Sequence, residues 1–457
     1  MKLDLKNLLF GRRLSEKSAD LSAVSEINSE NVSRWLDIYN GGGEWRYTRK
    51  GGIKGGTRKV ASLGAAKALC AELSRLCFTE GTDFVCADRE TERYLKKVFD
   101  ENCFSERISD FLEKAFASGG GVIKAYRDDN GVRLDFVTAD CFVPTKWDSR
   151  GFYGGAFGSN VTQNGKNYIF AETQDVTDKG LIIENKLFDE NGKERELSEV
   201  FPKMRGKTVI KGITKPLFVY FGTGAGKNRQ CPPFGASVYA DSEDTLKAID
   251  IVFDSLTREF ILGKKRIIVP SYAIRGEYDE SGELKRYFNV NDEVFETFST
   301  SDTDELKITD NTATLRVPEH IDALNELLDL LCMQAGLSEG TLSFRSGTLR
   351  TATEVISRNS RTYRTACFYR KAIARGLARV AENICLLGKM AGELSRNACE
   401  KVSIRFADGI CEDDGTRIER AQKLYSSGII SKARALSEIY GISLEEAKAM
   451  EKEDNND

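Results

Sequence analysis

The amino-acid sequence predicts an α+β protein, because strand-like and helix-like hydrophobic patterns occupy different parts of the chain. From Gly121 to about Ile213, apolar and polar residues alternate, which is the period of a half-buried strand. In 242–263 and again after Ile321, apolar residues recur at spacings of three and four, which is the period of an amphipathic helix. The 457 residues are 40% hydrophobic and 30% charged, so the chain can bury cores and is long enough for about three domains.

Helical spacing in the first part of the chain predicts helices over residues 28–40, 65–77 and 91–117. Between the first two, residues 41–64 are rich in Gly and in basic side chains and lack hydrophobic periodicity, which predicts a loop. Such a loop could contact nucleic acid or an acidic partner, but a solvated loop is the favoured interpretation.

Hairpin turns are marked by Asn-Gly pairs. The sequence Asp-Asn-Gly at 129–131 stands between two β-prone runs in 121–144, which is a strong hairpin signal. Two further Asn-Gly pairs, at 164–165 and 191–192, separate strand-like segments. Residues 1–213 are therefore expected to combine helices with small antiparallel sheets.

The second part of the chain begins with a helix predicted over 242–263, which ends at Gly263 where cations follow. Residues 267–317 return to a β pattern with a turn at 279–282, and a second helix is predicted over 321–335. The apolar faces of the two helices consist of Leu246, Ile249, Phe253, Leu256 and Phe260, and of Leu324, Leu328 and Leu331.

A polar stretch separates the second helix from the longest one. Residues 336–348 are rich in Gly, Ser and Thr, which predicts a loop outside the core. The long helix is expected over about 351–394 and would measure about 60 Å if unbroken.

The long helix carries a basic stripe. At about 100° per residue, its cations fall within a wedge of about 80°, and the apolar residues lie largely opposite. A solvated face normally mixes both signs of charge, so we favour an acidic neighbour or a phosphate backbone as its partner over a plain solvated face. The stripe comprises Arg361, Arg364, Lys371, Arg375 and Arg379.

The last segment, 412–457, is expected to contain short helices over 415–427, 431–440 and 444–450. Ser431 and Ser443 precede the latter two as N-caps. The acidic tail that follows is expected to be disordered.

Composition excludes several classes of protein. Lys and Arg number 67 against 70 Asp and Glu, so a net charge of −3 excludes a protein that grips phosphate over its whole surface. No apolar run approaches the roughly 20 residues that span a bilayer, and the N-terminus lacks the apolar stretch of a signal peptide. We therefore expect a soluble chain made in the cytoplasm, with no membrane partner.

The sequence gives little support for a metal site or a catalytic site. The eleven cysteines form no C-x-x-C pair and His320 is the only histidine, so we expect no metal site, no cofactor and reduced thiols packed as small hydrophobic groups. The loop Gly222–Lys227 fails as a phosphate loop, because Phe221 stands where the first Gly belongs and Asn228 follows the Lys. A turn-rich connector is the favoured interpretation, and we expect no enzyme activity.

Several sequence motifs together resemble the portal proteins of tailed bacteriophages. They are Pro216-Leu-Phe-Val-Tyr-Phe221, Pro233-Phe-Gly-Ala-Ser-Val-Tyr239, Leu262-Gly-Lys-Lys-Arg-Ile-Ile-Val269, Ala335-Gly-Leu-Ser338, Thr351-Ala-Thr-Glu-Val-Ile-Ser357 and Gly428-Ile-Ile-Ser431. Portal proteins form a ring, typically of twelve subunits, at one capsid vertex, and double-stranded DNA passes through its channel during packaging and ejection.

The resemblance implies a division of the chain into named parts. These are a mixed wing over 1–235, stem helices over 236–266 and 318–335, a β-rich clip over 267–317, a tunnel loop over 336–350, a long helix returning to the wing over 351–411, and a crown with an acidic tail over 412–457. The implied partners are identical subunits, the terminase large subunit docking at the clip, then a head-completion or adaptor protein, and the scaffold and major capsid proteins. The implied location is the virion, assembled in the bacterial cytoplasm.

The same resemblance assigns roles to residues. The tunnel-loop residues expected to face DNA are Ser338, Glu339, Thr341, Ser343, Phe344, Arg345, Ser346 and Arg350. The apolar stripes of 242–263 and 321–335 are expected to need neighbouring subunits to cover them, since one thin subunit would leave them exposed.

Two alternatives remain open at this point. One is a nucleotide-binding enzyme built around residues 222–228. The other is a monomeric capsid-associated protein that binds nucleic acid through 41–64 and 350–379.

Overall fold

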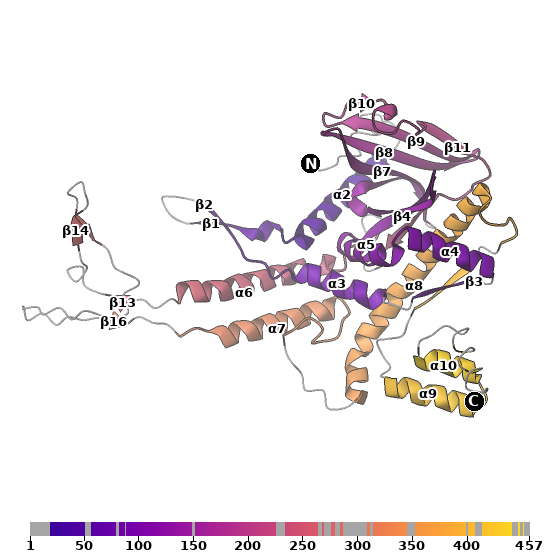
Figure 1. The fold of residues 1–457 in the computed structure, drawn as a ribbon. Helices are drawn as coiled ribbons and strands as arrows, with labels where there is room; N and C mark the ends of the chain where they lie inside the picture. Colours follow the sequence, from indigo (N-terminus) through magenta and orange to yellow (C-terminus); the bar gives the residue numbers. More distant parts are fainter. Residues whose placement is uncertain are drawn as a thin grey trace, which may run out of the picture.

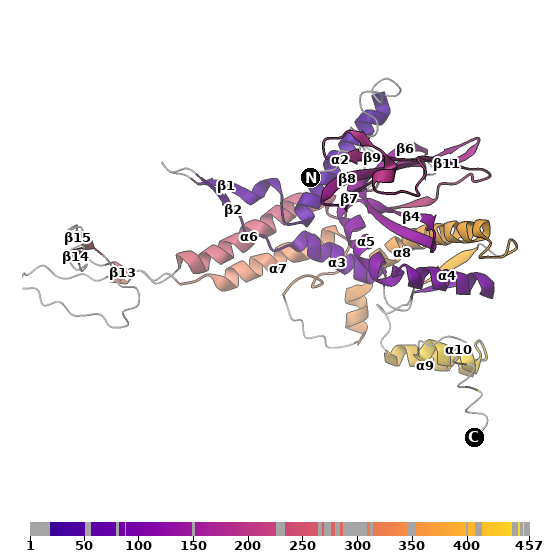
Figure 2. The same cartoon turned by 45° about the horizontal axis from the view of Figure 1, so that its top comes forward.

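The chain folds into a body of helices and antiparallel sheets from which two helices project side by side (Figures 1 and 2), as shown by a computed structural model. The predicted α+β class is confirmed. The structure describes residues 19–50, 56–78, 82–86, 88–148, 151–224, 234–263, 314–344, 352–398, 401–406 and 414–440, with short pieces at 267–268, 276–278, 284–286, 309–310, 447 and 451.

The described part of the body opens with helices α2 (Ala19–Tyr39), α3 (Ala65–Cys77), α4 (Arg89–Glu101) and α5 (Phe104–Ser118). The bounds of α3 are those predicted, whereas α2 begins well before residue 28. The predicted single helix over 91–117 is two helices, because Cys103 adopts a left-handed conformation with φ of 48° that interrupts the helix. Short 3₁₀ turns in the described residues lie at Glu44–Arg46, Ala139–Cys141, Leu197–Glu199 and Ala240–Ser242.

A three-stranded sheet with the order β12-β4-β5 forms the centre of the body. It contains β4 (Gly120–Asp128), β5 (Gly131–Thr138) and β12 (Phe218–Gly222), and the predicted hairpin turn joins β4 to β5. Helices α5 and α8 pack against it, and their apolar residues enter one large core with those of α3.

A larger antiparallel sheet covers the top of the body in Figure 1. Its strands are β6 (Phe142–Asp148), β7 (Gly151–Gln163), β8 (Lys166–Thr177), β9 (Gly180–Asp189), β10 (Glu194–Arg195) and β11 (Lys207–Ile210). Both predicted Asn-Gly pairs turn the chain here, between β7 and β8 and between β9 and β10. The buried ammonium of Lys124 on β4 donates to Glu172 on β8 at 2.8 Å and so ties the two sheets together.

Residues 41–64 do not form the predicted loop. They contain a two-stranded arm of β1 (Tyr47–Lys50) and β2 (Gly56–Lys59) that leaves the body beside α6 (Figure 1). A projecting two-stranded ribbon buries neither face on a core, so its sequence lacks the apolar alternation by which strands are recognised.

The two projecting helices are α6 (Glu243–Leu262) and α7 (Val317–Gln334), and we call them the stalk. Near their outer ends the Arg316 guanidinium pairs with Glu259 at 3.3 Å, and His320 Nε2 lies 3.1 Å from the Ser255 hydroxyl. Of the predicted β region over 267–317, the structure describes β13 (Ile267–Ile268) paired with β16 (Thr309–Asp310), and β14 (Gly276–Tyr278) paired with β15 (Leu284–Arg286). Most of that region lies outside the described residues.

The expectation that neighbouring subunits must cover both stalk stripes is wrong for most of their residues. Leu246, Ile249, Leu324, Leu328 and Leu331 are all buried in the subunit's own core, and Phe253 and Leu256 are half-buried against it. The reason is that α6 and α7 pack on each other and on the body at their inner ends. The exposed residues of the two stripes are Phe260 and Ile321, both at the outer end.

The chain enters the stalk through a close main-chain contact. Gly119, with φ of 87°, and Gly235 approach so closely that a Cβ added to either would collide with the backbone of the other. Glycine is therefore required at both positions.

The C-terminal part begins with the long helix α8 (Ala352–Ala391), followed by β17 (Val402–Arg405), which pairs with β3 (Asp83–Cys86). Helices α9 (Asp414–Ser426) and α10 (Lys432–Tyr440) form a separate pair, and the Ser431 hydroxyl accepts from Arg434 N at 3.3 Å as predicted. The predicted helix over 444–450 lies mostly outside the described residues. No helix in the described part of the chain is long and apolar enough to cross a bilayer.

Candidate nucleic-acid interface

The segment that links α7 to α8 starts as a fixed turn. Gly336 is left-handed with φ of 76°, and its carbonyl accepts from the Thr365 hydroxyl of α8 at 2.6 Å. Leu337, which follows, is fully buried. The segment therefore begins inside the core, although its composition predicts a polar loop.

Further hydrogen bonds hold the next residues to both helices. Ser338 is buried, with its N–H donating to the Thr362 hydroxyl at 2.9 Å while its own hydroxyl accepts from Thr362 N at 3.3 Å. The side chains of Asp329 and Asn325 on α7 accept from the backbone N–H groups of Gly340 and Phe344, at 2.7 and 2.8 Å. Residues 336–344 are thus anchored along their whole length.

This anchoring corrects the prediction that all tunnel-loop residues face outward. Ser338 faces α8, and the Thr341 hydroxyl donates to its carbonyl at 2.6 Å. Within the part of the chain that the structure describes, the buried Ser343 hydroxyl has no hydrogen-bond partner. Among the predicted residues, Glu339 and Phe344 are exposed, and Phe344 is 64% exposed. Arg345, Ser346 and Arg350 lie outside the described residues.

The predicted basic stripe of α8 is a solvent-facing row. All five of its cations are exposed, whereas Ile373, Leu377 and Ile384 on the other side of the helix are buried. Within the described part of the chain, no carboxylate lies within 4 Å of any stripe cation. A cation row without internal counter-charges is suited to bind an external anion, either phosphate groups or an acidic protein surface.

The end of the stripe adjoins the central sheet. Arg375 and Arg379 line a cavity of about 270 Å³ together with Tyr220 of β12. Burial raises the pKa of Tyr220 to about 12, so this phenol stays neutral at physiological pH. Gly376 lets α8 approach the ring of Phe221 closely, which fixes the stripe on the body.

The rejected phosphate loop is only partly described. Gly222 ends β12, and the hydroxyl of Thr223 donates to the carbonyl of Ala236 at 2.7 Å. Lys227 lies outside the described residues. In the described part that follows, the next α-helix starts only at Glu243, so no helix N-terminus directly follows the loop to bind a phosphate.

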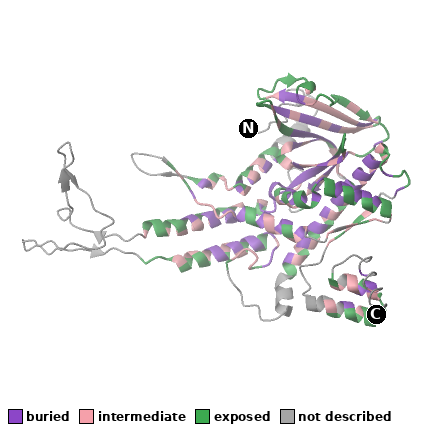
Figure 3. Ribbon diagram, viewed as in Figure 1, coloured by how far each residue is buried: buried purple, intermediate pink, exposed green. Residues whose placement is uncertain are grey.

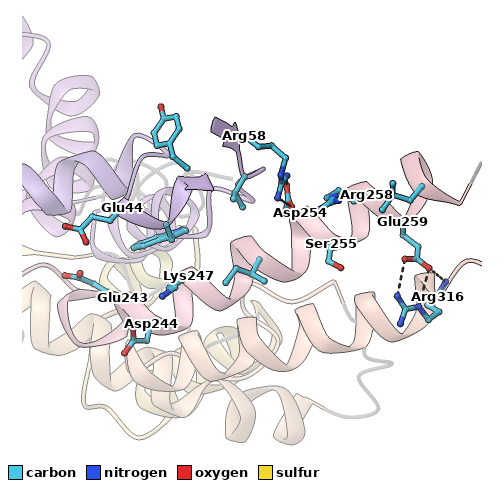
Figure 4. Close-up of a pocket in the computed structure, with 15 residues that line it drawn as sticks. Glu44, Arg58, Glu243, Asp244, Lys247, Asp254, Ser255, Arg258, Glu259 and Arg316 are labelled. Atoms are coloured by element: carbon cyan, nitrogen blue, oxygen red, sulfur yellow. Dashed lines mark hydrogen bonds and ion pairs between the residues drawn. The ribbon is translucent and has the colours of Figure 1, made fainter. Parts of the chain in front are cut away.

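A groove beside α6 was not predicted. It measures about 920 Å³ and lies between the β1–β2 arm and α6 (Figure 4). Arg58 of the arm forms two parallel hydrogen bonds of 2.7 Å with Asp254 of α6, and this guanidinium holds the pKa of the Asp254 carboxyl below its usual value. At the outer end, the hydrogen bonds from Arg316 likewise lower the pKa of Glu259.

One sequence signal could have pointed to these features. Asn325, Asp250 and Asp254 are polar residues on otherwise apolar helix faces, and all three are buried. A buried polar side chain requires a hydrogen-bond partner, which is the linking segment for Asn325, the arm for Asp254 and the residues flanking the arm for Asp250. The sequence does not say which partner is used.

No curated protein matches the chain. A solved structure titled "Virion of native gene transfer agent (GTA) particle" aligns with a TM-score of 0.42 and 12% identity, over 83% of this chain and 89% of that chain. A second, "Neck of empty GTA particle computed with C6 symmetry", aligns with a TM-score of 0.40, the same identity and the same coverage.

The profile of the family described as "Phage portal protein, SPP1 Gp6-like" matches residues 226–457, just over half of the chain. The matched part includes the stalk, the linking segment, the basic stripe and the α9–α10 pair. The chain therefore belongs to the phage portal protein family.

Proposed function

We propose that this chain is the subunit of a portal ring at one capsid vertex, and that double-stranded DNA passes through the ring during packaging and ejection. The observation that carries the proposal is the family match over 226–457. The projecting stalk adds support, since its outer end exposes Phe260, Ile261 and Leu262. Exposed apolar residues that are close together are typical of an interaction site.

The proposed parts of the portal subunit correspond to segments of the chain. Residues 1–235 form the wing, α6 and α7 the stem, 267–317 the clip, and 412–457 the crown. The tunnel loop is shorter than the sequence suggests, since the backbone of 336–344 is anchored to α7 and α8. It consists of the exposed Phe344 side chain and residues 345–350.

Other proteins of the virion are the proposed partners. The terminase large subunit docks at the clip and supplies the ATPase activity, and a head-completion or adaptor protein replaces it after packaging. The scaffold and major capsid proteins contact the wing. The basic stripe of α8 contacts either DNA phosphates or an acidic surface of a neighbouring protein.

The ring is tested by native mass spectrometry and electron microscopy of the purified chain. We expect closed rings of about twelve copies with a central channel of at least about 20 Å, wide enough for a DNA duplex. A compact monomer that persists under assembly conditions would contradict the proposal.

The absence of ATPase activity is tested on the same sample. We expect no ATP turnover by the purified chain, because the Gly222–Lys227 loop lacks the first Gly and the Ser or Thr of a phosphate loop. ATP turnover that is lost in Lys227→Ala would instead support the nucleotide-binding alternative.

A further inference from the structure

The cavity of about 270 Å³ beside the basic stripe lies between α5, β12 and α8. Its walls include apolar residues that are each at most 6% exposed, namely Leu112, Phe116, Val219, Phe221 and Ile373. The volume is just below the range of about 300–1,000 Å³ that is typical of pockets for drug-sized molecules. The cavity is therefore suited to a small apolar group, such as an amino-acid side chain.

The residues of α8 that border the cavity are short. Gly376 lacks a side chain, and a Cβ at this position would lie 2.3 Å from the ring of Phe221. Ala372, one turn earlier, also lines the cavity and is half-buried. These two residues bring the helix close to β12 without filling the space between them.

Two guanidinium groups border the same cavity. Arg375 and Arg379 line it and are exposed, so their charged ends remain in water while the interior is apolar. In the part of the chain that the structure describes, no carboxylate lies within 4 Å of either group. Glu382, the next acid along α8, pairs with Lys215 at 3.2 Å instead. Both arginines are thus available to an external anion.

The surface beside the cavity has the same two properties. Phe368 is 54% exposed, and its ring packs edge-to-face on Tyr369, which lines the cavity. Phe368 lies on the same side of α8 as the basic stripe, because it is four residues after Arg364 and three before Lys371. The cavity with its two arginines is therefore continued by further cations around an exposed aromatic ring.

The walls and the charges together restrict the chemistry of the ligand. Phosphate groups could pair with the arginines, but they would gain nothing from buried apolar walls. A small apolar molecule would gain from the walls but would leave the cations without a counter-charge. A peptide segment in which an apolar side chain stands beside several carboxylates uses both features at once.

We propose that the cavity between α5, β12 and α8 binds an acidic peptide segment of another chain. One apolar side chain of that segment fills the cavity, the carboxylates beside it pair with Arg375 and Arg379, and further carboxylates follow the basic stripe. The inference goes beyond the proposed function, because the site is complete within one subunit and its test does not depend on a ring.

Fluorescence anisotropy of the purified full chain with labelled probes tests this site. The first probe is a short peptide with a single Leu between runs of Glu, the second has Ser in place of that Leu, and the third is a DNA duplex. Ala372→Phe fills the cavity and leaves every cation in place, whereas Arg375→Gln with Arg379→Gln removes the bordering charges. Arg361→Gln with Arg364→Gln is the matched control, because it removes the same charge from the same stripe away from the cavity. Circular dichroism checks that each variant is folded.

We expect the wild type to bind the Leu peptide at least about tenfold more tightly than the Ser peptide, because the apolar side chain leaves water. Ala372→Phe should abolish this preference. Arg375→Gln with Arg379→Gln should weaken the binding of both peptides more than the control does.

Equal affinity of the wild type for the two peptides would overturn the proposal. So would a preference for the Leu peptide that Ala372→Phe leaves unchanged, since the Leu would then bind elsewhere. Binding of the DNA duplex alone would also overturn it and would assign the stripe to phosphate groups. Ring formation is measured separately, so failure of this site is distinguishable from failure of the proposed function.

Discussion

The apolar spacing of α6 continues from the inner end of the stalk to Phe260 at the outer end, but the two ends have opposite surroundings. At the inner end, Leu246 and Leu328 are at most 4% exposed, whereas at the outer end Phe260, Ile261 and Leu262 are 51–58% exposed. Figure 3 shows buried residues concentrated toward the body and exposed ones toward the tip. The spacing identifies the apolar face of a helix, but it does not reveal whether the same chain or another one covers that face.

The largest expected effect is a difference in unfolding free energy between substitutions at the two ends of the stalk. Leu328→Ala removes a buried side chain from the inner end and should lower the free energy of unfolding by about 2–5 kcal/mol. Phe260→Ser at the outer end should change it by less than about 0.5 kcal/mol in the unassembled subunit. Urea unfolding of both variants, followed by circular dichroism, measures the difference. Equal losses of stability would show that the outer end is also covered within one subunit.

A second prediction tests whether the linking segment belongs to the packed inner end. Thr362→Val preserves the shape of the side chain but removes the hydroxyl that accepts from the N–H of the buried Ser338. Leaving this group unsatisfied should cost about 1–3 kcal/mol of unfolding free energy, measured by urea unfolding. Thr341→Val is the control, because its hydroxyl donates to the Ser338 carbonyl instead of accepting from a buried N–H. The anchoring would be contradicted if Thr362→Val were no more costly than the control.

The contrast between the ends of the stalk also explains what the sequence could predict. Local sequence signals, namely hydrophobic spacing and turn residues, were sufficient to predict α3, the β4–β5 hairpin, α6 and the two-sided α8. They failed where a partner lies far along the chain: Asn325 anchors Phe344, and Asp254 binds Arg58 from a distance of 196 residues. Such long-range pairing has no period, so a single sequence does not reveal it.

A third prediction concerns the basic stripe, whose cations have no counter-charge in the described part of the subunit. Reversing Arg364, Lys371 and Arg375 to Glu should weaken ring assembly if the stripe faces an acidic neighbour. Each exposed ion pair contributes only about 0.2–1 kcal/mol, but every interface of a ring repeats the loss. Native mass spectrometry measures assembly. Normal assembly combined with reduced DNA packaging would assign the stripe to phosphate contacts instead.

The smallest expected effect is the response of the arm to acid. Because Arg58 lowers the pKa of Asp254 in the folded chain, this carboxylate stabilises the arm at neutral pH. The stabilisation is present above the unfolded pKa of about 3.9 and is lost as the pH falls through the lower folded pKa. Protection of the Ala61 amide, which donates to Asp254 at 2.9 Å, should then decrease in pulsed hydrogen exchange corrected for intrinsic rates. In Asp254→Asn this pH dependence should disappear, and its persistence would contradict the assignment.

The contact between Gly119 and Gly235 has a consequence for how the protein can diverge in evolution. The direction in which the stalk leaves the body depends there on main-chain atoms, because neither position has room for a side chain. Buried side chains at the inner end of the stalk hold the same direction through packing on the body. At the glycine contact itself, any substitution would have to displace main chain, so this point of the geometry leaves less room for change than the side chains around it.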